Sequence, residues 1–332
     1  MKKTINEEYG IRAAELTKVG HYDTFTLHQT RFFIIPINHL DDEELFELYS
    51  FSQYMTENRE PYIASMVLTK ENNLFFEKDD QKYILVKCGA HKRKEGNRIG
   101  RNLAAFHQKG RLFPYQVNKT QRIGQWKYLW EKRLDQLESF WREKIHSLPL
   151  NQFERRFVES FPYYLGLAEN AIQYLVDTEL DDDPQPIDSG TICHQRFHQH
   201  TWFPDINVKL PTDWVFDHCG RDIAEYMRHL FFEKQDFRTE CFHFLEDYDR
   251  TTPLSRFSYR LIYSRLLFPL HYFECIEGYY LAAENEKQTY EKLLERILNE
   301  SAKFEMFLRD YTRLLTSKTR RVAIPSVDWL IK

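Results

Sequence analysis

Short apolar runs separated by polar turns predict a small antiparallel sheet in the N-terminal part of the chain. These runs predict strands at residues 24–27, 31–37, 62–68, 74–76 and 82–87. Between the second and third runs, the acids at 41–44 precede apolar residues at helical spacing, which predicts a helix start. The order strand, strand, helix, strands predicts an α+β domain over residues 1–92.

Beyond this domain, the apolar positions follow helical spacing almost throughout. Helices are predicted at 99–107, 129–141 and 152–176, and in an aromatic-rich region from 222 to 315 with a turn at 251–253. The acidic, proline-containing segment 178–186 predicts the clearest loop of the chain. Residues 93–332 are therefore expected to form a second, mainly helical domain.

Composition excludes several classes of protein. The 46 basic and 50 acidic residues give a formal net charge of −4, which argues against nucleic acid as a partner. No apolar stretch is long enough to span a membrane, and the N-terminus runs into acids instead of an apolar signal core. We therefore expect a chain made in the cytoplasm without a signal peptide. The 5 cysteines are widely spaced and form no CxxC pair, as expected of reduced thiols.

Aromatic residues are unusually common, with 20 Tyr and 26 Phe among 332 residues. One interpretation is a helical core filled with aromatic rings, since many of them recur at helical spacing. The other is that exposed rings pack into an assembly, because aromatic residues are favoured at interfaces. The sequence leaves both open.

Three motifs in a fixed order resemble a known family. They are residues 98–107 (RIGRNLAAFH), 192–201 (ICHQRFHQHT), and 214–218 (WVFDH) with 221–224 (RDIA). In this order the chain resembles the bacterial spore coat proteins of the CotS group, particularly the YutH family, from about residue 10 to residue 330. That group shares the fold of aminoglycoside and choline phosphotransferases. The resemblance implies a two-lobed, protein kinase-like α+β fold with a small antiparallel-sheet lobe and a large helical lobe. It also implies a place in the endospore coat, with other coat proteins as partners.

The residues expected to perform phosphotransfer are replaced. In the related enzymes the catalytic loop, here within residues 191–222, reads H-G-D-x-H-x-x-N, where Asp is the base and Asn holds magnesium. His194 and His198 match the two histidines, but Arg196 stands at the Asp position and Thr201 at the Asn position. Arginine is a permanent cation that cannot accept a proton. The loop is therefore predicted to be catalytically degenerate.

The nucleotide-binding features are also absent from the sequence. The strand predicted at 31–37 contains no lysine to hold phosphates, so the helix acids Glu43, Glu44 and Glu47 lack the partner that a kinase requires. Neither Gly10 nor Gly20 belongs to a glycine-rich phosphate loop. We therefore predict no cofactor.

Other polar residues of the motifs have two interpretations each. Asp217, or Asp213 if the alignment slips, stands where the family places a magnesium-binding Asp, but a lone carboxylate also serves to cap a loop. By resemblance, Asp222 is expected to accept backbone N–H bonds from the catalytic loop, and His194 to hold that loop by hydrogen bonding. Both are predicted to be structural residues.

Two further site hypotheses are weaker. Cysteine and histidine ligands for zinc are clustered in the sequence, at Cys193, His194, His198, His200, His218 and Cys219, but their spacing matches no familiar zinc module. No motif marks a cysteine as an activated nucleophile. We therefore predict no metal and no cysteine catalysis.

The chain is accordingly expected to be a degenerate kinase-like protein that acts as a structural or assembly component of the spore coat, in an oligomeric state that the sequence leaves open. The alternative is an active small-molecule phosphotransferase in which Asp213 or Asp217 has taken over a catalytic role. A pseudokinase that binds nucleotide without catalysis lies between them.

Overall fold

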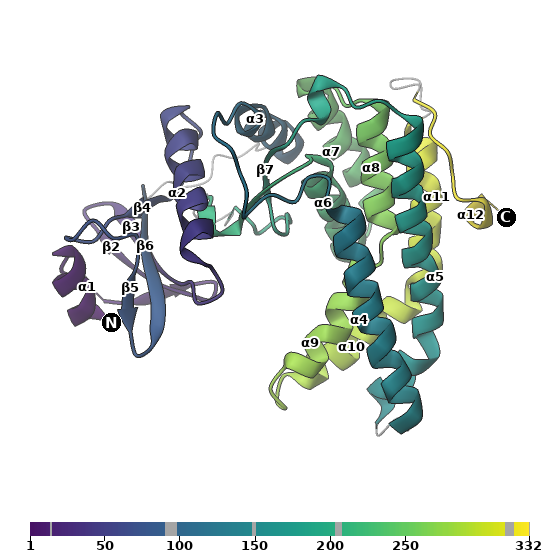
Figure 1. Cartoon of the computed structure of the whole chain (residues 1–332), viewed down its shortest axis with the longest axis horizontal. Coiled ribbons are helices and arrows are strands. Elements are labelled where there is room, and N and C mark those ends of the chain that lie inside the picture. The colour runs from purple at the N-terminus through teal and green to yellow at the C-terminus, as the bar shows by residue number, and fades with distance from the viewer. Residues whose placement is uncertain (14, 90–97, 148–150, 203–207, 316–321, 332) are drawn as a thin grey trace. The chain divides into compact units, whose positions relative to one another are not determined.

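Residues 2–89 form an antiparallel sheet flanked by two helices in the computed structural model (Figure 1). The six strands of this part of the described chain run in the order β1-β2-β3-β6-β4, with β5 paired to β6. They are β1 (Thr17–Val19), β2 (Tyr22–Leu27), β3 (Thr30–Pro36), β4 (Ser65–Val67), β5 (Phe76–Lys78) and β6 (Gln81–Gly89). The predicted strands are confirmed, except that the third is shorter than expected and the fourth begins only at Phe76.

The two faces of the sheet are covered by different helices. Ile5 of α1 (Lys2–Tyr9) packs into an apolar cluster with Phe25, Phe32 and Leu85. Because strand side chains alternate between faces, the neighbouring apolar residues of β3 and β6 point to the opposite side, toward α2 (Asp42–Glu57). The sequence did not predict α1, whereas the predicted helix start at α2 is confirmed.

A capping box explains where α2 begins. The Glu44 amide donates to Asp41 Oδ1 at 2.8 Å, and the Asp41 amide donates to Glu44 Oε2 at 3.2 Å. This reciprocal pair satisfies amides that the first helical turn cannot bond internally. Glu44 therefore serves to cap the start of the helix.

The motif segments form a second small assembly. Strands β7 (Thr191–His194) and β8 (Trp214–Asp217) pair antiparallel, and β8 follows a short 3₁₀ turn, η2 (Pro211–Asp213). Helix α3 (Ile99–Arg111) packs on β7 so closely that a Cβ at Gly110 would lie 2.7 Å from the Ile192 nitrogen. Glycine is therefore required where α3 meets the strand that leads into the catalytic loop.

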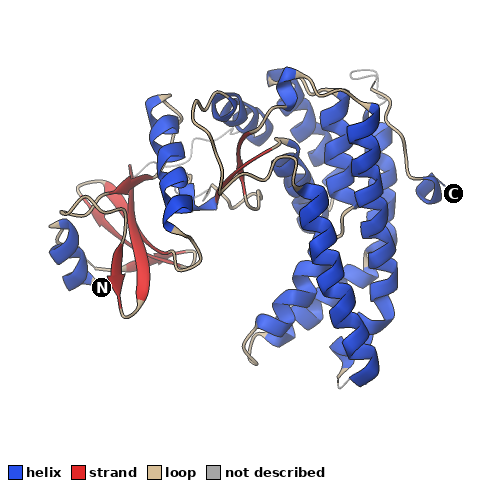
Figure 2. Ribbon diagram, in the orientation of Figure 1, coloured by secondary structure: helices blue, strands red, loops and turns tan. Residues whose placement is uncertain are grey.

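The rest of the described chain is helical. Figure 2 shows strands in the sheet and the β7–β8 pair, and helices joined by loops elsewhere. The helices, with one 3₁₀ turn, are α4 (Trp126–Ser147), α5 (Gln152–Asp181), η1 (Pro186–Asp188), α6 (Gly220–Glu233), α7 (Phe237–Thr251), α8 (Arg256–Leu267), α9 (Leu270–Leu281), α10 (Lys287–Asn299), α11 (Ser301–Leu315) and α12 (Asp328–Ile331). Helix α5 lies alongside α4 and α8.

The loop predicted at 178–186 was wrong in its first half, because α5 continues to Asp181. Its acids are compensated: Arg260 Nη2 lies 3.1 Å from the Asp181 carboxylate, and Arg260 Nη1 lies 2.7 Å from that of Asp182. Charges that indicated a solvated loop are instead paired with a helix distant in sequence. The helix ends just before Pro184, which disfavours helical backbone at the residue that precedes it.

The structure describes residues 1–13, 15–89, 98–147, 151–202, 208–315 and 322–331. These fall into two compact units. Unit 1 comprises Met1–Arg122, Gly190–Asp222 and Glu246–Thr252, and unit 2 comprises Ile123–Ser189, Ile223–Leu245 and Pro253–Lys332. The sheet and all three motifs, apart from the last two residues of the third, belong to unit 1. The predicted domain boundary between residues 92 and 93 lies outside the described residues.

Many aromatic rings are buried, but not all. Tyr259, Tyr263 and Tyr272 are among the largest fully buried side chains, whereas Phe46 and Tyr115 are largely exposed. Buried rings thus fill the core as the first interpretation expects, whereas packing of the exposed rings into an assembly stays a prediction. In the described part of the chain, no helix combines the length and apolar character needed to cross a membrane.

Candidate functional site

The catalytic-loop segment begins at the end of β7, and Asp222 lies at its centre. The Asp222 carboxylate accepts the His194 amide at 2.9 Å, His194 Nδ1 at 2.7 Å and His107 Nε2 at 3.1 Å. All three residues are buried. Burial alone would raise the pKa of Asp222, but these bonds and the neighbouring histidines outweigh it and hold the pKa well below the usual carboxyl range. One carboxylate therefore joins α3, β7 and the start of α6.

The hydrogen-bond partners of His194 and His107 determine which ring nitrogen of each histidine carries the proton. The Trp202 indole nitrogen is a donor only, and it lies 2.9 Å from His194 Nε2, so that nitrogen must accept. His194 Nδ1 therefore carries the proton and donates to Asp222. On the other side, His107 Nε2 donates to the Asp222 carboxylate, and burial lowers the pKa of His107 and so favours the neutral ring; Nδ1 therefore accepts the Tyr248 hydroxyl at 2.8 Å. The result is a chain of directed hydrogen bonds that converge on Asp222.

The positions that should carry catalysis make local contacts. Arg196 Nη1 donates to the Gln195 carbonyl at 2.9 Å. The Thr201 hydroxyl donates to the Arg196 carbonyl at 3.0 Å and accepts the His198 amide at 2.9 Å. Thr201 thus closes a turn of the loop. In the same turn, burial lowers the pKa of His198.

Asp217 is held by an arginine that the sequence analysis overlooked. Its carboxylate is fully buried, 2.8 Å from Arg221 Nη1, and also accepts the His218 amide at 2.7 Å. Arg221 Nε donates to the His194 carbonyl at 2.9 Å. The spacing of four residues within 217–221 was the only sequence signal for this pair. A guanidinium therefore neutralises this buried carboxylate.

Asp213 lies in a different setting. Its carbonyl accepts the Gln195 amide at 2.7 Å, and its half-buried carboxyl lines a cavity of about 360 Å³ together with Tyr22 and His39. Burial raises the pKa of Asp213 to about 6. A carboxyl of this kind exchanges its proton near neutral pH.

The three helix acids that lacked a kinase partner have other partners. Glu43 pairs with Lys119 at 3.2 Å, and Glu44 belongs to the capping box. Glu47 accepts the amides of residues 118–120 at distances of 2.7–3.0 Å. These acids therefore hold α2 and its surroundings in place.

The structure contains a buried lysine, Lys209, outside the strand in which the sequence analysis looked for one. Lys209 pairs with Glu60, and its ammonium group lies 4.3 Å from the ring centroid of Trp202. Burial lowers the pKa of Lys209 although Glu60 opposes this shift. Lys109 also binds Glu60, at 2.9 Å. This cluster ties the segment after α2 to the segment before β8. Residues 109 and 209 lie far from Glu60 in sequence, so no local pattern could have revealed it.

The six residues considered as zinc ligands are not brought together. In the described part of the chain, the group whose ligand atoms lie within 4.8 Å of one another is His107, Cys193 and Asp222. The His107 and Asp222 atoms are already hydrogen-bonded to each other. Burial raises the pKa of the Cys193 thiol, which disfavours the nucleophilic thiolate.

Solved structures define the class of protein. An aminoglycoside phosphotransferase from Alicyclobacillus acidocaldarius matches with a TM-score of 0.66 and 14% identity, covering 94% of this chain and 96% of that chain. A spectinomycin phosphotransferase matches with a TM-score of 0.60 and 13% identity, covering 89% and 93% respectively. The fold is therefore the kinase-like fold of the aminoglycoside phosphotransferases, as expected.

The family follows from closer relatives. The family model described as "Spore coat putative kinase YutH" matches residues 2–311. The endospore coat-associated protein YutH of Bacillus subtilis is 49% identical over 334 aligned positions, which cover 100% of this chain and 98% of that protein. The chain belongs to the YutH family of kinase-like spore coat proteins.

Proposed function

We propose that this chain is a catalytically degenerate kinase-like protein that acts as a structural or assembly component of the endospore coat. The observation that carries the proposal is the Arg221–Asp217 ion pair, because it occupies the carboxylate that the fold would use for magnesium. Phosphoryl transfer depends on positioned cations and on a group that orients the nucleophile. Arg196 stands at the position of the group that would orient the nucleophile.

The retained polar residues support an architectural role. Asp222 and His194 form directed hydrogen bonds that need no nucleotide, and Glu47 binds backbone amides instead of a strand lysine. A buried network with every member paired makes a local structure unique and rigid. We therefore assign His194 and Asp222 to holding the loop.

The proposed location derives from the relative in Bacillus subtilis, which is described as endospore coat-associated. Identity of 49% along the whole chain supports the same location here, with other coat proteins as partners.

Turnover measurements test the loss of catalysis. Purified protein is incubated with ATP, magnesium and a panel of small alcohols and amines, beside the variants Asp217→Asn and Asp213→Asn. We expect ADP release at the level of the buffer for all three proteins. Turnover that either variant abolishes would refute the proposal.

The second candidate is an active small-molecule phosphotransferase with a rearranged site. It is favoured by Asp213, whose pKa of about 6 and place at the edge of a cavity suit a proton acceptor. Activity lost in Asp213→Asn but kept in Asp217→Asn would favour this candidate.

A further inference from the structure

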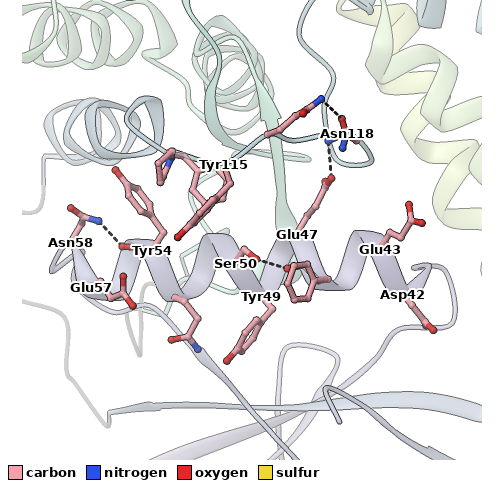
Figure 3. A pocket seen from close by; sticks show the side chains of 15 residues that line it. Asp42, Glu43, Glu47, Tyr49, Ser50, Tyr54, Glu57, Asn58, Tyr115 and Asn118 are labelled. Carbon is pink, nitrogen blue, oxygen red and sulfur yellow. Dashed lines mark hydrogen bonds between the residues drawn. The ribbon is translucent and has the colours of Figure 1, made fainter. Parts of the chain in front are cut away.

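An open groove of about 930 Å³ runs along α2, within unit 1 (Figure 3). One wall is the helix itself, from Asp42 to Asn58, and the other is the segment 113–118 that follows α3. Its size is in the range of ligand-binding cavities. Among the residues described, neither Asp217 nor Asp222 lines the groove, and neither do those of the catalytic-loop segment.

The second wall is fixed in place before any ligand arrives. Glu47 accepts the amides of Asn118 at 2.7 Å, Lys119 at 3.0 Å and Thr120 at 2.8 Å. Near the other end, the Tyr54 hydroxyl donates to the Lys109 carbonyl at 3.1 Å. A groove with prearranged walls loses less entropy on binding than one that must be ordered.

Aromatic rings form much of the lining. Phe113 packs edge-to-face against both Tyr54 and Tyr115, with centroids 5.3 Å and 5.4 Å apart. Phe46 is 61% exposed and Tyr115 is 67% exposed. Exposed aromatic surface in a concave site is typical of an interaction surface.

The charge of the lining is of one sign. Its charged members are Asp42, Glu43, Glu47 and Glu57, and among the described lining residues there is no lysine, arginine or histidine. Asp42 and Glu43 pair at the edge with Lys82 and Lys119. Glu57 makes no ion pair within the described residues, and Figure 3 places it at the opposite end of α2 from Asp42 and Glu43.

We propose that this α2 groove docks an extended cationic segment of a partner protein, in which Lys or Arg alternates with apolar or aromatic side chains. The cations would pair with Glu57 and lie over the rings of Tyr54 and Tyr115, and the apolar side chains would cover Phe46. A Lys or Arg side chain is attracted both to carboxylates and to the faces of aromatic rings, so a cationic segment can bind both kinds of group in the lining.

Other occupants fit less well. A neutral apolar ligand would desolvate the Glu57 carboxylate without a partner, and an anionic ligand would be repelled. A second copy docked groove to groove would place identical acids against one another, since a two-fold interface pairs the same surface on both subunits.

The inference rests on the proposed assembly role and adds a partner class to it. Its test uses neither ATP nor spores, so a failed docking experiment leaves the loss of phosphotransfer untouched.

Fluorescence anisotropy of labelled peptides tests the proposal with the full chain at low salt. The probe is a short peptide of alternating Lys and Phe, and the comparison peptides alternate Glu with Phe and Lys with Gly. We expect the Lys-Phe peptide to bind at least about tenfold more tightly than either comparison, with an affinity that falls as salt rises.

Matched variants locate the binding. Phe46→Ser combined with Tyr115→Ser, and separately Glu57→Lys, should each weaken binding by about tenfold or more. The controls are Leu281→Ser, whose side chain is 87% exposed, and Glu169→Lys on the exposed face of α5; neither lines the groove. Both controls should bind as the unmodified chain does.

Three results of the peptide measurements would overturn the proposal. They are absence of Lys-Phe binding at millimolar peptide, equal binding of the Glu-Phe peptide, and binding that the groove variants leave unchanged. Self-association of the chain that Phe46→Ser removes would assign the groove to a second copy instead, which also overturns it.

Discussion

Arg221 Nη1 lies 2.8 Å from the carboxylate of Asp217, whose side chain is fully buried. The same guanidinium donates through Nε to the His194 carbonyl, so it joins the ends of β7 and β8. The buried Asp217 carboxylate therefore has its counter-charge within the protein, and removal of that charge should lower the stability of the fold.

Replacement of Arg221 by Met should lower the free energy of unfolding by about 3 kcal/mol, because the Asp217 carboxylate would remain buried without its counter-charge. Arg196→Met is the matched control and should change it by about 0.5 kcal/mol, since Arg196 is partly exposed. Urea midpoints report the difference, provided that the m-values agree. Equal effects of the two substitutions would show that the ion pair adds nothing.

Asp222→Ala should be at least as damaging, at about 3 kcal/mol, because it leaves three buried donors on His194 and His107 without an acceptor. Asp247→Ala, which removes an ion pair with the exposed Arg98, should cost less than about 1 kcal/mol. Urea unfolding of both variants decides the matter. A loss for Asp222→Ala no larger than for Asp247→Ala would contradict the central role of Asp222.

Asp213 should make the protein more stable in mild acid. Burial raises the pKa of its carboxyl to about 6, above the value of about 4 expected in the unfolded chain. Between these values the folded chain binds the proton more tightly, so this contribution to stability falls as pH rises from about 4 to 6. Asp213→Asn should remove that slope and raise stability at pH 7 by about 1–2 kcal/mol, after allowance for solvent screening of a half-buried carboxyl.

The measurement is urea unfolding at several pH values between 4 and 8. The difference between Asp213→Asn and the unmodified chain should be largest above pH 6 and smallest at pH 4. A difference that does not vary with pH would show that Asp213 keeps its usual pKa.

A fluorescent fusion should gather around the forespore late in sporulation and remain on released spores, as expected for the YutH family. Fluorescence microscopy of sporulating cells, with growing cells as the control, reports the location. A uniform signal in both would favour a metabolic enzyme over a coat component.

The sequence alone was sufficient for the elements whose signals are local. Apolar periodicity predicted the strands around β3 and β6, and Asp41 with Glu44 marked the start of α2. The loop substitutions at Arg196 and Thr201 are also visible without coordinates, because the spacing of a motif is a property of the chain. These signals involve residues only a few positions apart, and they determine the local backbone conformation directly.

Pairings between distant residues depended on tertiary structure. The acidic, proline-containing segment 178–186 predicted a loop, yet α5 continues to Asp181, and Arg260 pairs with Asp181 and Asp182. Glu60 meets Lys209 only because the segments that carry them pack together. The free energy of a charge depends on what surrounds it, and folding alone brings those surroundings together.

The sequence by itself therefore predicted most strands of the sheet, the start of α2 and the family, and it places Arg196 where the related motif has Asp. Tertiary structure decided that Arg221 neutralises Asp217, that two histidines converge on Asp222, and that aromatic rings and carboxylates meet along α2. The physical reason is that a residue's type sets which partners it can take, whereas packing sets which of them lie within bonding distance.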